Sequence, residues 1–207
     1  MSSIALSYNG PGSIKLPRSV APIVKAAQLL FVHFERPNLE QAQQYLRDFG
    51  LIVAESNENE LFMRGTGPQP YIYRVTKGPN ARFLGLGFSV ATVDDLRKLA
   101  KAFGKTIQSA QTPGGGFVVR LQDPEGVAVD VLHGFIASKE LPLRAAIPHN
   151  APNQIVRVND TQRPTLEPPQ VTKLGHLVLE VPDFDLSARW YMDTLGFIPS
   201  DVMCLPD

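Results

Sequence analysis

The chain has 207 residues, with 20 Lys and Arg against 20 Asp and Glu, 43% hydrophobic residues and one cysteine. The zero net charge argues against a nucleic-acid surface, because phosphate binding requires a basic face, and equally against a polybasic membrane patch. The single cysteine, Cys204, excludes an intrachain disulfide and a cysteine-based zinc site.

The sequence shows no targeting or membrane-spanning segment. Residues 1–16 lack a basic start followed by an apolar core, so we expect no signal peptide. The longest apolar stretch, 26–34, contains Gln28 and His33 and is far shorter than the about 20 residues that a bilayer requires. We therefore expect a cytoplasmic protein with no membrane and no nucleic-acid partner.

Composition divides the chain into four parts. Residues 1–24 form an N-terminal arm rich in Ser, Gly and Pro, and 135–171 form a proline-rich connector. Proline fixes φ and removes a backbone donor, so the connector is expected to be extended. Between them, 25–134 is a domain of two modules, and 172–207 is the start of a further module.

The first module begins with a β-rich apolar strand at 28–35. Asn38 can cap a helix over 39–49, where apolar residues recur at helical spacing. Gly50 is expected to end this helix as a left-handed cap. Turn residues then separate three predicted strands: 51–55, 60–64 and 71–77.

The same order of elements follows again, about 54 residues later. A strand over 82–90 precedes a helix over 93–103. Thr92 and Asp95 are spaced as a capping box at the start of this helix, and Gly104 can end it. Three further strands are predicted: 106–109, 116–122 and 127–132. A repeated β-α-β-β-β module predicts an α+β architecture.

A third copy begins with an expected strand at 174–181. Asp183 or Asp185 can cap the helix that follows, Gly196 can end it, and 197–203 would form a second strand. Two strands of the module are missing, which leaves unpaired edges. We therefore expect the chain to be a fragment of a longer parent protein, and we expect a homo-oligomer.

Three stretches of the sequence resemble the vicinal oxygen chelate superfamily, which includes glyoxalases, bleomycin resistance proteins and dioxygenases. They are the opening Gly175-His176-Leu177-Val178-Leu179-Glu180-Val181-Pro182-Asp183 with Trp190-Tyr191 and Leu195-Gly196-Phe197, the segment 45–51 of the first module, and the turn Asp123-Pro124-Glu125-Gly126. The resemblance covers 25–134 and 172–207. It implies paired βαβββ modules that form a half-open barrel around a metal.

The order of the modules looks like that of the type I extradiol ring-cleavage dioxygenases. The resemblance implies a metal-free N-terminal pair, 25–134, and a catalytic C-terminal pair that begins at 172. It further implies Fe(II) or Mn(II) in the intact parent, a catechol-like aromatic substrate, O2 and a role in aromatic compound catabolism. The catalytic residues would lie beyond residue 207. The fragment is therefore expected to be inactive, and it need not bind a metal by itself.

His176 is the main candidate for chemistry in this chain. Strand alternation places it with Val178 and Glu180 on one face, opposite the face of Leu177. The resemblance makes His176 the first ligand of a 2-His-1-carboxylate triad, a geometry that leaves metal positions open. The alternative is a structural histidine whose ring bonds a backbone carbonyl.

The first two modules lack such a histidine. Leu29 aligns with His176 and carries no donor atom. Asp130 stands where catalytic modules carry a ligand carboxylate, although a hydrogen-bonded or solvated strand residue is the alternative. Leu29, Phe31 and His33 share one strand face, and with Asp130 they are candidates to line a pocket. A purely structural role for His33 is the competing interpretation.

Two other functions remain open, because a fold does not determine its reaction. One is a glyoxalase-like isomerase or epimerase on the same scaffold. The other is a metal-free small-molecule binding protein that holds an apolar ligand against Leu29, Phe31 and His33.

Overall fold

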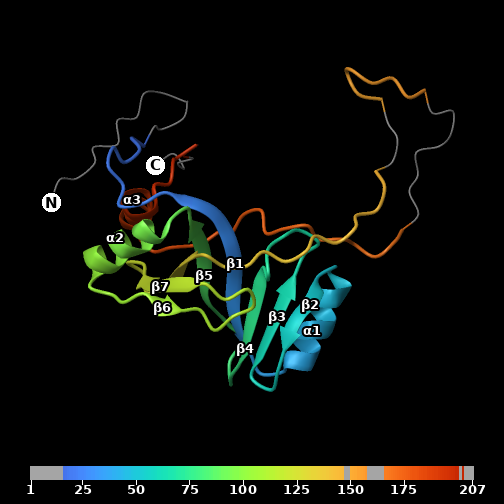
Figure 1. Cartoon of the computed structure of the whole chain (residues 1–207), viewed down its shortest axis with the longest axis horizontal. Helices are drawn as coiled ribbons and strands as arrows, with labels where there is room; N and C mark the ends of the chain where they lie inside the picture. Colours follow the sequence, from blue (N-terminus) through green and yellow to red (C-terminus); the bar gives the residue numbers. More distant parts are fainter. Residues whose placement is uncertain (1–15, 147–149, 158–165, 201, 203–207) are drawn as a thin grey trace. The chain divides into compact units, whose positions relative to one another are not determined.

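The computed structural model describes residues 16–146, 150–157, 166–200 and 202. Residues 1–15 of the expected arm, and residues 201 and 203 of the last expected strand, lie outside this range. The chain has an α+β fold (Figure 1), and none of its described helices has the length and apolar character needed to cross a membrane.

The predicted β-α-β-β-β order is confirmed in both modules. The first comprises β1 (Ala26–Arg36), α1 (Leu39–Asp48), β2 (Ile52–Ser56), β3 (Glu60–Arg64) and β4 (Tyr73–Lys77). The second comprises β5 (Arg82–Val90), α2 (Val93–Phe103), β6 (Gln108–Ser109), β7 (Phe117–Gln122) and β8 (Ala128–His133). A last helix, α3, spans Phe184–Leu195.

The chain forms two compact units. The boundary between them falls within β1 and within β5. Of the described residues, unit one contains 16–32, 84–136, 175–200 and 202, whereas unit two contains 33–83 and the described part of 137–174. The strand order is β1-β5-β8-β7-β6 in unit one and β2-β3-β4-β1 in unit two.

In unit two, α1 packs on one face of its strands (Figure 1). Leu61 and Met63 alternate along β3, are fully buried, and pack in one core cluster with Leu46 of α1. Asn38 caps the helix as predicted, since its Oδ1 accepts a hydrogen bond from the Gln41 amide at 3.0 Å. The predicted end is wrong by one position: Phe49 is the C-cap in right-handed conformation, and Gly50 follows it with φ +103°.

In unit one, α2 packs on β7 and β8, and β5 runs parallel to β8. Thr92 and Asp95 form the predicted capping box, and Gly104 ends α2 in left-handed conformation. Leu96 and Leu99 on the inner face of α2 are fully buried. These local signals place the helix on the sheet as the sequence predicts.

The helix of the third module is confirmed, but its first strand is not. Asp183 caps α3 through the Leu186 amide, and Gly196 ends it in left-handed conformation. Residues 174–181 are described but form no strand. The alternating pattern supplies one apolar side, whereas a strand also requires a hydrogen-bonded neighbour. No strand is described at 197–200 or 202 either.

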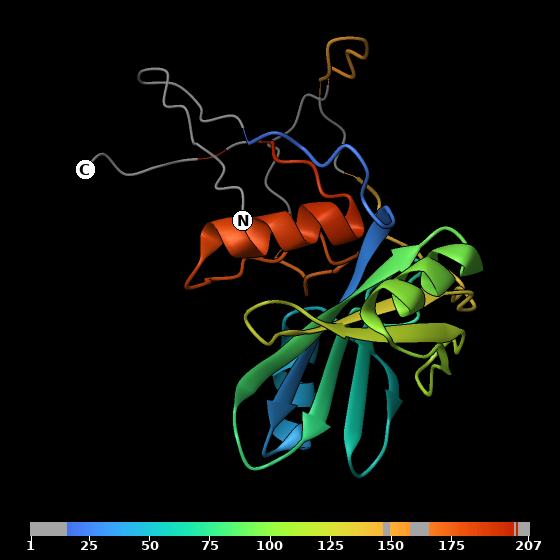
Figure 2. The same ribbon diagram turned by 90° about the vertical axis from the view of Figure 1, so that its left-hand side faces the viewer.

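The helix α3 belongs to unit one, where it lies beside the segment that leads into β1 (Figure 2). The amides of Ile23 and Val24 donate to the carbonyls of Asp193 and Thr194, at 2.8 and 3.2 Å. The rings of Phe88 and Phe197 meet edge to face, with centroids 5.3 Å apart. These contacts hold α3 and the residues after it against the strands of unit one.

Candidate functional site

A cavity of about 610 Å³ lies within unit one, between the start of β1, β5, residues 176–181, α3, residues 197–200 and Val202. We call it the α3 cavity. Its lining is mostly apolar and includes Leu29 and Leu86 from the strands, and Phe88, Tyr191 and Phe197 as aromatic walls. Its polar lining residues are Gln28, His176, Ser187 and Ser200. No Lys, Arg, Asp or Glu lines it among the described residues.

Ser187 contributes a buried hydroxyl to this lining. The residue is 5% exposed, and its Oγ has no hydrogen-bond partner among the described residues. Its backbone amide continues the helix by donating to the Asp183 carbonyl at 3.2 Å. Its Oγ is therefore a buried polar atom behind the cavity wall, and the other polar lining residues are Gln28, His176 and Ser200.

Tyr191 lies one helical turn after Ser187, and its hydroxyl is already engaged. It donates to Asp123 Oδ2 at 3.0 Å in a buried contact. Burial, followed by the negative charge of Asp123 and this hydrogen bond, raises the pKa of Tyr191 well above its ordinary value. The phenol therefore stays protonated at neutral pH and presents only its ring to the cavity.

His176 lines the same cavity as Leu29, so the structure brings these two predicted residues together. His176 is exposed and forms no hydrogen bond with the described residues. A metal implied by the fold would need further donors beside it. Among the described residues, no three His, Cys, Asp or Glu side chains are grouped to hold an ion. The donor set seen here does not fit a complete metal centre.

Phe31 and Asp130 lie in unit one but do not line the α3 cavity. Phe31 is 2% exposed and packs against Gly87 of β5. Asp130 pairs with Arg120 across β7 and β8, with its Oδ1 3.9 Å from Arg120 Nε. The neighbouring guanidinium balances the charge of this carboxylate.

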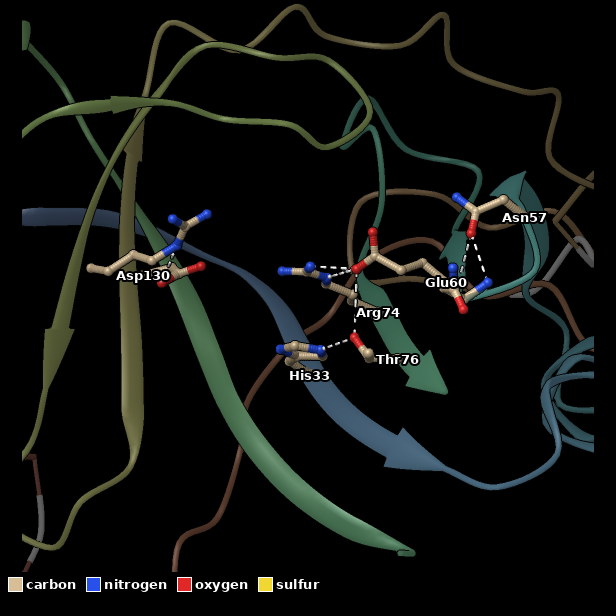
Figure 3. A network of polar contacts seen from close by, with 8 residues as sticks. His33, Asn57, Glu60, Arg74, Thr76 and Asp130 are labelled. Atoms are coloured by element: carbon tan, nitrogen blue, oxygen red, sulfur yellow. Dashed lines mark hydrogen bonds and ion pairs between the residues drawn. The ribbon is translucent and has the colours of Figure 1, made fainter. Parts of the chain in front are cut away.

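His33 belongs to a polar network in unit two (Figure 3). Its Nε2 and Thr76 Oγ1 share a hydrogen bond of 2.7 Å. The Thr76 hydroxyl also contacts Glu60 Oε1 at 3.5 Å, and Arg74 Nε donates to that same oxygen at 2.9 Å. Burial, followed by the positive charge of Arg74, lowers the pKa of His33 from 6.5 to about 4. The ring is therefore neutral at neutral pH.

The sequence did not lead us to expect that Ser187 and Tyr191 line a cavity. A signal was present, because the two residues are four positions apart and so share one helix face with the apolar Leu195. A small polar residue on the buried face of an amphipathic helix indicates a polar contact or a cavity. Their partner Asp123 is 68 positions away from Tyr191, and no local pattern gives that pairing.

No protein-family model matches the sequence, and no curated protein matches it. Solved structures do match. A Mn(II)-bound glyoxalase from Novosphingobium aromaticivorans is 18% identical with a TM-score of 0.52, covering 58% of this chain and 43% of the glyoxalase.

Two further matches are dioxygenases. Homoprotocatechuate 2,3-dioxygenase from Brevibacterium fuscum, in complex with 3,4-dihydroxyphenylacetate, is 23% identical with a TM-score of 0.52, covering 60% of this chain and 42% of the enzyme. An extradiol ring-cleaving dioxygenase from B. fuscum is also 23% identical, with a TM-score of 0.50, covering 60% and 37%.

These likenesses establish the fold. The chain has the vicinal oxygen chelate fold that the sequence resemblance implies. It spans about two fifths of the length of each of these three proteins.

Proposed function

We propose that the whole natural protein containing this chain is a metal-dependent extradiol-type dioxygenase, which opens catechol-like rings with O2 and uses Fe(II) or Mn(II). The observation that carries the proposal is the repeated module order, joined to a fold shared with homoprotocatechuate 2,3-dioxygenase. The bound 3,4-dihydroxyphenylacetate of that neighbour supports an aromatic diol as the substrate class. A homo-oligomer in the cytoplasm stays a prediction.

In this proposal, residues 25–134 form the metal-free structural half and His176 is a metal ligand. The exposed imidazole, without a hydrogen bond to the described residues, supports the availability of His176 for coordination. The described residues hold no group of three donors, so the remaining ligands would have to come from elsewhere in the whole protein. Asp130 stays outside the proposed ligand set, since Arg120 pairs with it.

Oxygen consumption tests this proposal. Residues 1–207 with Fe(II) and 3,4-dihydroxyphenylacetate should consume O2 no faster than Fe(II) alone. The whole protein should bind about one metal ion per chain and yield a ring-opened product. His176→Ala in the whole protein should lose both metal and turnover, whereas Glu180→Ala, four residues further along the same segment, should keep the metal. Turnover by residues 1–207 alone, or a whole protein without metal and without O2 uptake, would overturn the proposal.

A glyoxalase-like isomerase is the second candidate, and the Mn(II)-bound glyoxalase among the neighbours favours it. Such an enzyme would isomerise a hemithioacetal without consuming O2. The same oxygen electrode therefore separates the two reactions. A metal-free binding protein is the third candidate, favoured by the apolar α3 cavity. Metal analysis of the whole protein separates it from both enzymes.

A further inference from the structure

We propose that the segment 175–181 is an interface between two copies of this chain, which pair it antiparallel as a two-stranded ribbon centred on Val178. The contact goes beyond the proposed dioxygenase function, since it needs no metal and no turnover. It gives the expected homo-oligomer a defined interface, formed by residues of unit one.

The segment has the form of a strand that lacks a neighbour. Between 175 and 181 the chain makes no turn or bend. Its side chains alternate, because Leu177 and Leu179 are half-buried and line the α3 cavity, whereas His176 and Val178 are exposed. Alternation with a period of two residues is typical of extended backbone. The segment therefore already has the side-chain pattern of a strand with one packed face.

The backbone of this segment is open to pairing. No residue of 175–181 belongs to a strand, and no backbone hydrogen bond joins the segment to another of the described residues. Backbone N–H and C=O groups in folded proteins normally have partners, and an open strand edge pairs readily with another chain. A second strand is therefore the partner that this backbone selects.

The order of the residues favours a second copy of the chain as that strand. Antiparallel pairing centred on Val178 sets His176 opposite Glu180 of the partner subunit, and Glu180 opposite the partner's His176. A nitrogen donor thus faces a carboxylate twice, and complementary groups in such positions stabilise paired strands. A parallel, in-register arrangement would instead set Glu180 against the partner's Glu180, and like charges directly opposite each other are destabilising.

The middle and the ends of the segment fit the same register. Val178 is 81% exposed, and on the two-fold axis its side chain packs against its own copy. Gly175 and Val181 are equally distant from Val178, and Pro182, which has no backbone donor, follows the segment. The contact is small, so we expect a weak dimer whose population rises with protein concentration.

Sedimentation equilibrium of residues 1–207 in EDTA tests the association, and we expect a monomer–dimer equilibrium. His176→Glu sets two carboxylates opposite each other and should weaken the dimer about tenfold. Glu180→Lys removes the acceptor opposite the imidazole and should weaken it similarly. The double variant sets a carboxylate opposite an ammonium, so its dissociation constant should return to within about threefold of the original. Glu58→Lys is the control, since Glu58 is exposed and outside the segment, and it should leave the dissociation constant unchanged.

Disulfide crosslinking tests the register, in a Cys204→Ser background that removes the other thiol. Val178→Cys places two thiols opposite each other on the axis, with Cβ atoms about 5 Å apart, so mild oxidation should yield a linked dimer. Glu180→Cys is the matched control at another exposed position. Its two thiols would be separated by roughly 14 Å along the ribbon, so this variant should stay unlinked.

A chain that stays monomeric at every concentration overturns the proposal and leaves the open edge to a strand of the whole protein itself. Equal crosslinking at positions 178 and 180, or a double charge variant as weak as the single ones, overturns the antiparallel pairing on which the proposal rests. The metal and oxygen assays of the whole protein are independent of these outcomes, so failure here leaves the dioxygenase proposal in place.

Discussion

The hydroxyl of Tyr191 donates to Asp123 Oδ2 at 3.0 Å and so joins α3 to the turn between β7 and β8. Asp123 is 5% exposed, and its other carboxylate oxygen accepts the amides of Glu125 and Val127 at 3.0 and 2.8 Å. One carboxylate thus closes the turn and holds the helix of the next module. The Asp-Pro-Glu-Gly turn is therefore both a local reversal of the chain and an anchor.

Removing this anchor should destabilise unit one. Tyr191→Phe leaves Asp123 Oδ2 without its donor inside the protein, and such a loss costs about 1–3 kcal/mol. We expect the free energy of unfolding in urea to fall by that amount. Tyr45→Phe is the control, because Tyr45 is 66% exposed and its change should stay within about 0.5 kcal/mol. Equal effects of the two substitutions would show that the anchor contributes nothing.

The close approach of Phe31 and Gly87 leaves no room for a side chain on β5. A Cβ at position 87 would lie 2.1 Å from Phe31 Cε1. Gly87→Ala should therefore destabilise the protein by about 1–3 kcal/mol through overpacking. Adding Phe31→Leu should make the double variant more stable than the sum of the single effects predicts.

Gly175→Ala is the control for this substitution, since nothing lies within 4 Å of its Cβ position. Thermal unfolding of all four variants measures the coupling. Strict additivity of Gly87→Ala and Phe31→Leu would contradict the steric explanation.

Protonation of His33 should make stability depend on pH. The pKa of His33 is about 4 in the folded protein, against the ordinary value of 6.5 expected in the unfolded chain. The unfolded chain therefore binds the proton more readily. The contribution is complete above pH 6.5 and is lost as pH falls from 6.5 toward 4. Between pH 8 and pH 5 this amounts to about 2 kcal/mol.

The His33→Gln variant isolates this effect, since Arg74, Glu60 and Thr76 remain around the ring position. Urea unfolding at both pH values should show that the original chain loses about 2 kcal/mol more than the variant. A parallel loss in both proteins would place the pH dependence on other groups.

The capping box at the start of α2 should contribute measurably to stability. Thr92 Oγ1 accepts the Asp95 amide at 3.2 Å, and Asp95 Oδ2 accepts the Thr92 amide at 3.1 Å. Thr92→Ala should cost about 1 kcal/mol of unfolding free energy. Thr106→Ala, at an exposed position outside any helix or strand, should cost little. A cost for Thr92→Ala as small as that for Thr106→Ala would show that the cap is not needed.

The features that the sequence predicted well depend on near neighbours in the chain. Asn38, Thr92 and Asp183 cap helices through amides three residues away, and such spacing is visible in the sequence. The alternating pattern at 174–181 was equally visible, yet no strand is described there. Strand formation depends on a partner strand, and one segment's own pattern cannot supply that partner.

The candidate site was predictable only in part, for the same reason. Leu29 and His176 were expected to occupy equivalent places, and the structure instead brings both to one cavity under α3. Phe31 follows Leu29 on the same strand face, yet it packs against Gly87 and does not line that cavity. The residues that meet there are brought together by α3, which bonds to Asp123 and to the backbone of Ile23 and Val24, all distant in the sequence.

Two residues of the proline-rich stretch, Leu141 and Val171, bond to the backbone of the same residue, Thr66. In unit two, the Leu141 amide donates to the Thr66 carbonyl at 2.8 Å, and the Thr66 amide donates to the Val171 carbonyl at 2.9 Å. The beginning and the end of the stretch are thus hydrogen-bonded to a single residue. A proteolytic cut between 150 and 157 would leave the Thr66 bond to Val171 joining the two pieces, together with the bonds from the Gly67 amide to the Thr172 carbonyl and from the Val171 amide to the Gly50 carbonyl, at 3.0 and 3.4 Å. We expect the two pieces to remain associated after such a cut.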